Sequence, residues 1–281
     1  MDIMMCKGER DLAVLAEVPL PFRLGLKFFS INIDLLPQAI ALWEAGLFDY
    51  IELYAIPGTH KETCTGWQQS SIPFVIHAPH SFHGVNLAMA SCRKDNHSIL
   101  TETLKFSDDL AVEKIIVHGG HSGSIEETIE QVASLRDDRI FLENKPKVGL
   151  HDELCVGWSP EEFRFAQQSE VFAGFVLDFG HATCAARSLL KEPMEMINEF
   201  LSLDPQIFHL VDGNRASEKD IHNNLGRGDF DLSRYALSVP EKTWLTLETP
   251  RESLDDFVDD VIFLHKLIGE SWAGNSWRAC K

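Results

Sequence analysis

Short apolar runs, rich in β-branched and aromatic residues, alternate along the chain with longer segments in which apolar residues recur at helical spacing. This alternation is typical of parallel strands joined by helical crossovers. The runs predict eight strands, at residues 24–29, 50–54, 74–77, 114–118, 140–143, 174–178, 207–211 and 243–248. Eight strand–helix units indicate an α/β protein with the (β/α)8 TIM-barrel fold.

The segments between these runs predict helices at residues 35–45, 96–111, 125–135, 160–168, 188–201 and 254–267. Two of the helix starts carry local signals, namely Asp34 and the pair Ser159-Pro160, because Pro is favoured at the first helical position. The connection after the second strand has no clear pattern. Residues 212–242 are mostly polar and show little sign of a full helix after the seventh strand.

The length of the chain fits a single domain. It has 281 residues, and one TIM barrel takes about 250. The sequence contains neither an internal repeat nor a low-complexity linker. We therefore expect the barrel at residues 21–270, with an N-terminal extension at 1–20 and a C-terminal tail at 271–281.

Composition bears on the compartment of the protein. No run approaches the roughly 20 apolar residues that span a bilayer, so no membrane partner is expected. The N-terminus has no secretion signal, which favours a cytoplasmic location. The six cysteines lie far apart with no CxxC pair, so we interpret them as free thiols and not as disulfides or a thiolate zinc site.

The formal net charge is −18. A surface this acidic repels phosphate backbones and disfavours DNA as a partner. Carboxylates that bind metal ions do not act as free negative charge, however, so the net charge lowers the expectation of DNA binding without excluding it.

Side chains that bind metals end or follow most of the predicted strands, where a barrel places its active-site loops. These residues are His77, His118, Glu143, Asp178 with His181 three positions later, His209 and Glu248. A single histidine at a strand end is ordinary, but so many polar side chains at one mouth favour a metal cluster, because buried carboxylates need cations.

The loop after the seventh predicted strand adds two further donors, Asp220 and His222. Gly226 and Gly228 follow, but they come directly after no strand and lack the companion residues of a phosphate-binding loop. We interpret the two glycines as turn residues that bring the pair back over the barrel mouth.

The motifs around these residues resemble the endonuclease IV family, within the wider group of xylose isomerase-like TIM barrels. They are His77-Ala78-Pro79, Val85-Asn86-Leu87-Ala88, Val117-His118-Gly119-Gly120, Leu142-Glu143-Asn144, Asp178-Phe179-Gly180-His181-Ala182, His209-Leu210-Val211-Asp212, the segment from Asp220 to Gly228, and Leu247-Glu248-Thr249-Pro250. The resemblance covers about residues 74–250. It implies three metal ions, usually zinc, bound by nine residues: His77, His118, Glu143, Asp178, His181, His209, Asp220, His222 and Glu248.

The first 70 residues depart from this pattern. The family's opening strand carries G-x-H-x-S, where this chain has Leu-Gly-Leu-Lys-Phe-Phe-Ser at residues 24–30. Residues 49–54 look more like the sugar isomerase and epimerase branch. The family places a Tyr after the His-Ala-Pro motif, and this chain has His80, with Phe82 nearby.

The resemblance favours a metal-dependent phosphoester hydrolase, with Glu143 as a bridging catalytic carboxylate and Glu248 beside it. Two to three zinc ions are expected, and manganese or iron would suit the same ligands. A sugar isomerase or epimerase would need only Glu143, Asp178, His209 and Glu248 around one ion. A multinuclear iron enzyme that catalyses an oxidation is a further alternative, and a non-catalytic scaffold would have no use for so many donors.

The expected substrate is a phosphodiester or a small sugar-like molecule. Three histidines near the predicted mouth, His80, His83 and His121, are candidates for substrate contact. The remaining candidates for contacting a phosphate or orienting the ligands are Asn144, Lys145, Asp212, Arg227 and Arg251.

Overall fold

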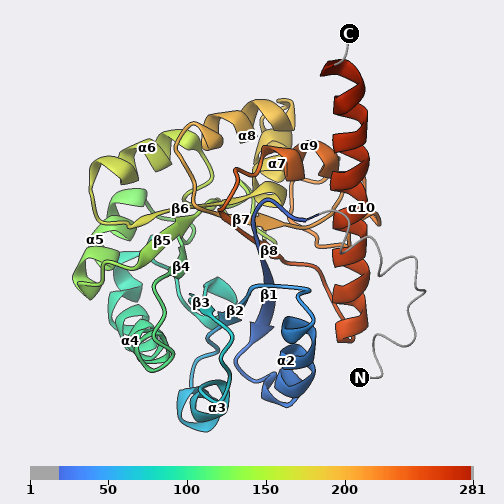
Figure 1. The fold of residues 1–281 in the computed structure, drawn as a ribbon. Helices are drawn as coiled ribbons and strands as arrows, with labels where there is room; N and C mark the ends of the chain where they lie inside the picture. Colours follow the sequence, from blue (N-terminus) through green and yellow to red (C-terminus); the bar gives the residue numbers. More distant parts are fainter. Residues whose placement is uncertain (1–18, 280–281) are drawn as a thin grey trace.

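The computed structural model describes residues 19–279 of the chain. Eight parallel strands form one closed barrel in sequence order, which confirms the predicted (β/α)8 fold (Figure 1). The strands are β1 (Arg23–Phe29), β2 (Tyr50–Tyr54), β3 (Phe74–His77), β4 (Ile115–His118), β5 (Ile140–Glu143), β6 (Gly174–Asp178), β7 (Ile207–Leu210) and β8 (Trp244–Leu247).

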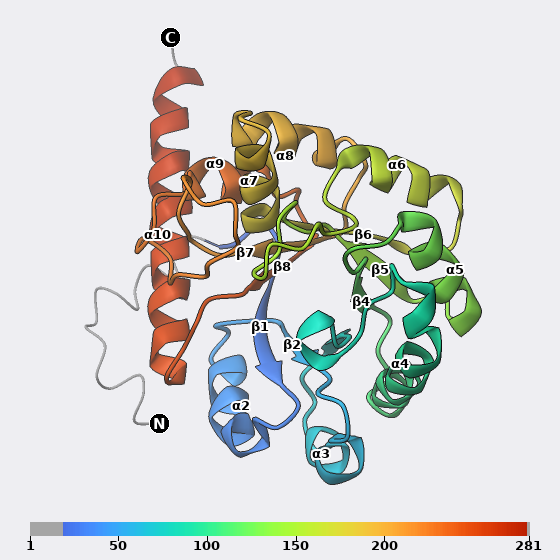
Figure 2. The same ribbon diagram turned by 180° about the vertical axis from the view of Figure 1, so that it is seen from behind.

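Helices surround the strands, as the reverse view in Figure 2 also shows. They are α2 (Leu36–Glu44), α3 (His60–Trp67), α4 (Arg93–Asp109), α5 (Ile125–Leu135), α6 (Pro160–Gln168), α7 (Phe179–Ser188), α8 (Pro193–Leu201), α9 (Leu232–Ser238) and α10 (Leu254–Ala279). Three short 3-10 turns lie in the loops: η2 (Ile33–Leu35), η3 (Ser81–His83) and η4 (Ala90–Cys92). No described helix is long and apolar enough to cross a membrane.

The core has two layers. The larger lies between the strands and the helices, and the smaller fills the lower part of the barrel interior, as in TIM barrels generally. Tyr50 belongs to the inner layer and fits there because Gly25 faces it, since a Cβ on Gly25 would come within 2.4 Å of the tyrosine ring. The phenol oxygen of Tyr50 lies 2.7 Å from the Thr246 hydroxyl, at the boundary between this apolar plug and the polar residues above it.

The strand register sets the level of the polar residues. His118 is the register partner of Glu143 across β4 and β5, and Asp178 is the partner of His209 across β6 and β7. Residues far apart in sequence are thereby brought to the same end of the barrel.

The helices differ from the prediction in three places. The predicted helix at 188–201 corresponds to α8, which begins five residues later. Helix α7, which begins directly after β6, was not predicted. The unassigned connections contain α3 and the short α9. Eight of the ten residues of α7 are buried, so this segment has no polar face from which helical periodicity could be read. The predicted boundary at residue 270 lies inside α10, and most of the predicted N-terminal extension lies outside the described residues.

Candidate metal centre

The nine residues predicted as metal ligands lie together at the carboxyl ends of the strands, with Glu143 at the centre. One oxygen of Glu143 lies 3.1 Å from Nε2 of both His77 and His118. The other lies 3.3 Å from Nδ1 of His181 and 3.5 Å from Nδ1 of His209. This carboxylate therefore faces histidines from four different elements with its two oxygens.

A second group of donors lies beside the first. The carboxylate of Asp220 lies 2.6 Å from Nε2 of His222 and 3.4 Å from Nε2 of His181. Asp178 lies 3.8 Å from His181 and 3.9 Å from His209. Four sets of three side chains in this region bring one ligand atom each to within 4.8 Å of the others: His77, His118 and Glu143; His181, Asp220 and His222; Glu143, Asp178 and His181; Glu52, His209 and Glu248.

Four of the five histidines share one hydrogen-bonding arrangement. Each places one ring nitrogen on an oxygen that does not belong to the four predicted ligand carboxylates and turns the other nitrogen toward those carboxylates. These oxygens are Ala78 O for His77 (2.8 Å), Asn144 O for His181 (2.7 Å), Glu248 O for His222 (2.7 Å) and Glu52 Oε2 for His209 (2.9 Å). A carbonyl or carboxylate oxygen only accepts, so the nitrogen that faces it carries a proton, and in the neutral imidazole the inward nitrogen keeps a lone pair. This is the arrangement of histidines that bind metals.

Several buried ligand atoms have no hydrogen-bond partner among the residues that the structure describes. They include Glu143 Oε1, Asp178 Oδ2, Asp220 Oδ1, His209 Nδ1 and both ring nitrogens of His118. Buried polar atoms are almost always satisfied, so unsatisfied atoms that converge on one place indicate a missing partner. Cations fit that role because most of these atoms are oxygens of carboxylates or nitrogens with a lone pair.

The pKa values show the opposing forces at this centre. Burial lowers the pKa of His118 to about 3, with a further contribution from Lys145. Burial raises the pKa of Asp178 to about 6. Burial also acts on Glu143, but the surrounding histidines, His118 first, bring its pKa well below the ordinary value. In contrast, although burial opposes the shift, neighbouring carboxylates raise the pKa values of His181, His209 and His222. Neutral His118 next to ionised Glu143 is the pair of protonation states that a divalent ion requires.

The short segment from Asp178 to His181 is fixed by helix capping. Asp178 ends β6 and is the N-cap of α7, and its Oδ1 accepts a 2.6 Å hydrogen bond from the backbone N–H of His181. Asn144 accepts a hydrogen bond from Asp178 N through its side chain and donates one to Asp178 O. The cap therefore aims both side chains into the mouth, and Asn144 orients them, as the sequence suggested.

Asp212, a candidate for contacting a phosphate or orienting the ligands, binds the loop after β7. Its buried carboxylate accepts hydrogen bonds from four backbone N–H groups, those of Gly213, Gly226, Gly228 and Phe230. A Cβ on Gly228 would lie 2.4 Å from this carboxylate, so only glycine allows the approach. The lone pairs of Asp212 thus hold the loop after β7 together, and its contact with a phosphate stays a prediction.

The sequence interpretation missed two charged residues, Lys27 and Glu52. The ammonium of Lys27 contacts the carboxylate of Glu248 and lies 3.2 Å from Glu52. Glu52 is fully buried and binds His209 and the hydroxyl of Thr246, at 2.6 Å. Each is a charged residue in the middle of an otherwise apolar predicted strand, which is the sequence feature that could have identified it. Neither lies at a strand end, where the ligands were expected.

A cavity of about 480 Å³ opens above the centre. Its walls contain Lys27, Lys145, His80 and His121, and exposed apolar side chains of Phe82 and Leu150. His80 stacks on His118 with ring centroids 4.9 Å apart.

The other polar candidates lie farther from the cavity floor. His83 binds the phenol of Tyr54 at 2.8 Å. Arg251 packs over the ring of Phe257, and neither it nor Arg227 is among the side chains that line the cavity.

The fold and the site together define a (β/α)8 barrel with a candidate metal centre at the carboxyl ends of its strands, and comparison with known proteins adds to this description. No family model matches the chain. The sequence is 25% identical over 223 residues to proteins named probable endonuclease 4 from Mycobacterium ulcerans (strain Agy99) and Mycobacterium marinum (strain ATCC BAA-535 / M), with 74% of this chain and 84% of each relative covered. The resemblance to endonuclease IV seen in the motifs is thereby confirmed.

Solved structures named as endonuclease IV and as an epimerase-like protein both share the fold of this chain. Endonuclease IV from Thermus thermophilus superposes with a TM-score of 0.64 at 21% identity, covering 88% of this chain and 99% of that one. Another protein of the same organism, solved after soaking with ZnCl2, has a TM-score of 0.65 at 21% identity over 89% and 99% of the two chains. A D-tagatose 3-epimerase-like protein also reaches 0.65, at 19% identity and the same coverage.

Proposed function

We propose that the protein is a metal-dependent phosphoester hydrolase of the endonuclease IV type, with two or three divalent ions held by the nine residues named above. The observation that carries the proposal is the arrangement of the histidines, in which the inward ring nitrogens and a central carboxylate face one another without enough hydrogen-bond donors between them. The relatives named endonuclease 4 support the same activity class.

The donor set fits zinc. It consists of five imidazoles and four carboxylates, which suit zinc and would also accept manganese or iron. Asp220, His181 and His222 form one group of donors, while His77, His118 and Glu143 form another. Glu143 also belongs to a group with Asp178 and His181, so its two oxygens can serve neighbouring ions.

When bound, divalent ions lower the pKa of a coordinated water to about 7 and neutralise charge on the phosphate oxygens. The side chains of the protein itself orient the metal ligands and bind the substrate. Asn144 and the cap at Asp178 fix two ligands before any substrate arrives. Lys145 lines the cavity and offers a positive charge to a phosphate. The stacked pair of His80 and His118 forms part of the cavity wall.

A phosphodiester is the proposed substrate, and Glu143→Gln is the first test. The substitution keeps the shape and removes the negative charge that holds two cations close together. Metal ions contribute several kcal/mol to transition-state stabilisation, so turnover should fall by at least about a hundredfold, with the circular dichroism spectrum retained. The assay uses a small activated phosphodiester and a duplex with an abasic site. Glu113→Gln, at an exposed site just before β4, is the matched control and should keep full turnover.

Unchanged turnover in Glu143→Gln would show that this carboxylate is wrongly assigned. Cleavage of the small diester without cleavage of the duplex would identify a small phosphodiester as the substrate and would agree with the net charge of −18.

Sugar isomerisation or epimerisation is the second candidate, favoured by Lys27. Its ammonium contacts Glu248, one of the two glutamates that would move the proton in that reaction. His77→Ala separates the two functions. A multinuclear hydrolase should lose an ion and most of its rate, whereas an isomerase with one ion on Glu143, Asp178, His209 and Glu248 should retain that ion. Proton exchange between a ketose and solvent, with no phosphodiester cleaved, would establish the second candidate.

A further inference from the structure

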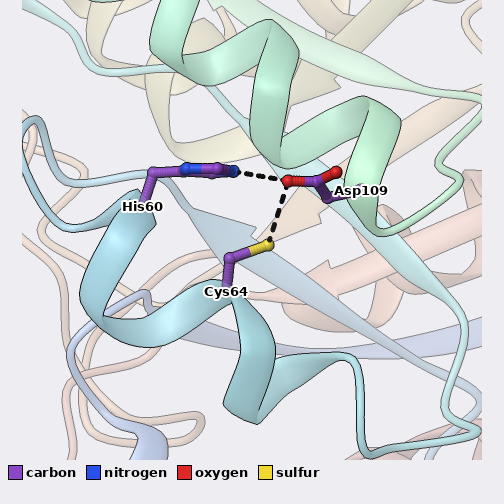
Figure 3. Close-up of side chains that lie close together, drawn as sticks. All are labelled: His60, Cys64 and Asp109. Atoms are coloured by element: carbon purple, nitrogen blue, oxygen red, sulfur yellow. Dashed lines mark hydrogen bonds and ion pairs between the residues drawn. The ribbon is translucent and has the colours of Figure 1, made fainter.

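Three side chains that bind metals also meet away from the barrel mouth, on the outer helices. His60 and Cys64 lie one turn apart on α3, and Asp109 is the last residue of α4 (Figure 3). Nε2 of His60 lies 2.7 Å from Oδ2 of Asp109, and Sγ of Cys64 lies 3.9 Å from the same oxygen. All three ligand atoms fall within 4.8 Å of one another.

We propose that His60, Cys64 and Asp109 form a second metal site, for Zn²⁺ or a similar divalent ion, independent of the centre in the barrel. Residues four apart on a helix lie on the same face, so His60 and Cys64 present their donors side by side. Tetrahedral zinc with these ligand types separates its ligand atoms by about 3.3–3.7 Å. The distances of 2.7 and 3.9 Å to Asp109 lie on either side of that range, so a small rotation of the carboxylate satisfies both.

A cation would balance the negative charge of this cluster. Burial and the neighbouring carboxylate of Asp109 raise the pKa of the Cys64 thiol to about 11, so the thiol is neutral in the absence of metal. No lysine or arginine that the structure describes pairs with the Asp109 carboxylate. A bound zinc ion removes the thiol proton and neutralises the carboxylate together.

The exposure of the three residues fits a site that exchanges its ion with solvent. Cys64 is only 4% exposed, while the side chain of Asp109 is 49% exposed. Three protein ligands therefore leave one position open to water. An ion here would link the start of α3 to the end of α4. The spacing of cysteines in sequence did not point to this site, because the third ligand comes from another helix.

Cobalt binding tests the proposal, because Co²⁺ gives a charge-transfer absorption in the near ultraviolet only when a thiolate is a ligand. The full chain is freed of metal with a chelator and titrated with Co²⁺. We expect this absorption in the wild-type protein, its loss on addition of Zn²⁺, and its absence in Cys64→Ser. His60→Ala keeps the thiol and should weaken the Co²⁺ affinity that this band reports by about tenfold or more.

Two control variants make the result specific. Cys155 lines the mouth cavity, and Cys155→Ser should keep the absorption, which excludes this thiol as its source. Glu143→Gln disturbs the barrel centre and should keep it as well, which separates this site from the proposed hydrolase. A wild-type protein without the absorption at saturating Co²⁺, or a Cys64→Ser variant that retains it, would show that the cluster is only a hydrogen-bonded His–Asp pair next to a thiol.

Discussion

Lys27 changes the charge balance of the site at the level of single residues. Its ammonium lies between two carboxylates, those of Glu52 and Glu248, and it comes from the middle of the first strand. Although burial opposes the charged form, Glu248 and Glu52 raise the pKa of Lys27 above its ordinary value, so it stays charged. One fixed positive charge is therefore present in the site before any ion binds.

The substitution Lys27→Met should destabilise the metal-free protein more than the metal-bound protein. Removing one partner of a buried ion pair costs about 3 kcal/mol or more, and two carboxylates lose their partner here. A divalent ion on Glu248 would replace part of the lost charge. Urea unfolding with and without Zn²⁺ measures both effects. Lys105→Met, exposed on α4, should change stability by less than about 0.5 kcal/mol in either state. Equal losses for Lys27→Met with and without Zn²⁺ would refute this role.

At this scale the sequence predicted which residues meet but not what surrounds them. His77, His118 and Glu143 could be found because strand ends share one face of a barrel. Lys27 and Glu52 could not be assigned that way, because their contacts depend on how far each side chain reaches across the barrel interior. That distance is a property of the closed barrel and not of either strand.

Among the secondary-structure elements, the junction of β6 and α7 does the most to build the site. Asp178 ends the strand, caps the helix and points a second oxygen at the metal centre. Eight of ten α7 residues are buried, so the helix has little freedom to tilt. Helix capping and metal binding thus depend on the same carboxylate.

Two substitutions at Asp178 should separate these roles. Asparagine caps helices about as well as aspartate, so Asp178→Asn should keep α7 and lose metal affinity, while Asp178→Ala should lose an additional 1 kcal/mol or so in the metal-free state. Ser124→Ala removes the side-chain cap of α5 and should cost about 1 kcal/mol with unchanged metal content. Metal analysis and urea unfolding give both quantities. Equal stability of the Asn and Ala variants would show that the cap contributes little.

The strands were predicted nearly to the residue, and the helices less well. Short runs such as Phe74–His77 and Ile140–Glu143 are buried throughout and apolar up to their last residue, because both faces of a barrel strand are buried. Helix α7 is also buried on most of its surface, so its sequence shows no alternation of polar and apolar positions at helical spacing. Helix α9 is only seven residues long and follows a loop held together by Asp212, which no local pattern reveals.

For the molecule as a whole, the concentration of acidic groups at one mouth makes stability depend on metal. Five carboxylates meet there: Glu52, Glu143, Asp178, Asp220 and Glu248. An ion at 100 times its dissociation constant stabilises the folded state by about 2.7 kcal/mol. Removal of metal with a chelator should therefore lower the melting temperature by at least about 5 °C, and Zn²⁺ should restore it. Calorimetry measures the shift, and a melting temperature that does not respond to the chelator would contradict a metal centre in the barrel.

The contact between Lys27 and Glu248 joins residues that lie 221 positions apart, one on the first strand of the barrel and the other directly after the last. During synthesis, Lys27 leaves the ribosome long before Glu248 has been made. The donors cannot be complete, and the ring of strands cannot close, until most of the chain has emerged. If the proposed ions bind, loading of the full set would therefore be a late event in biogenesis. A chain that stops short of β8 would have the histidines but lack the carboxylate that meets the ammonium of Lys27 at the junction of the two strands.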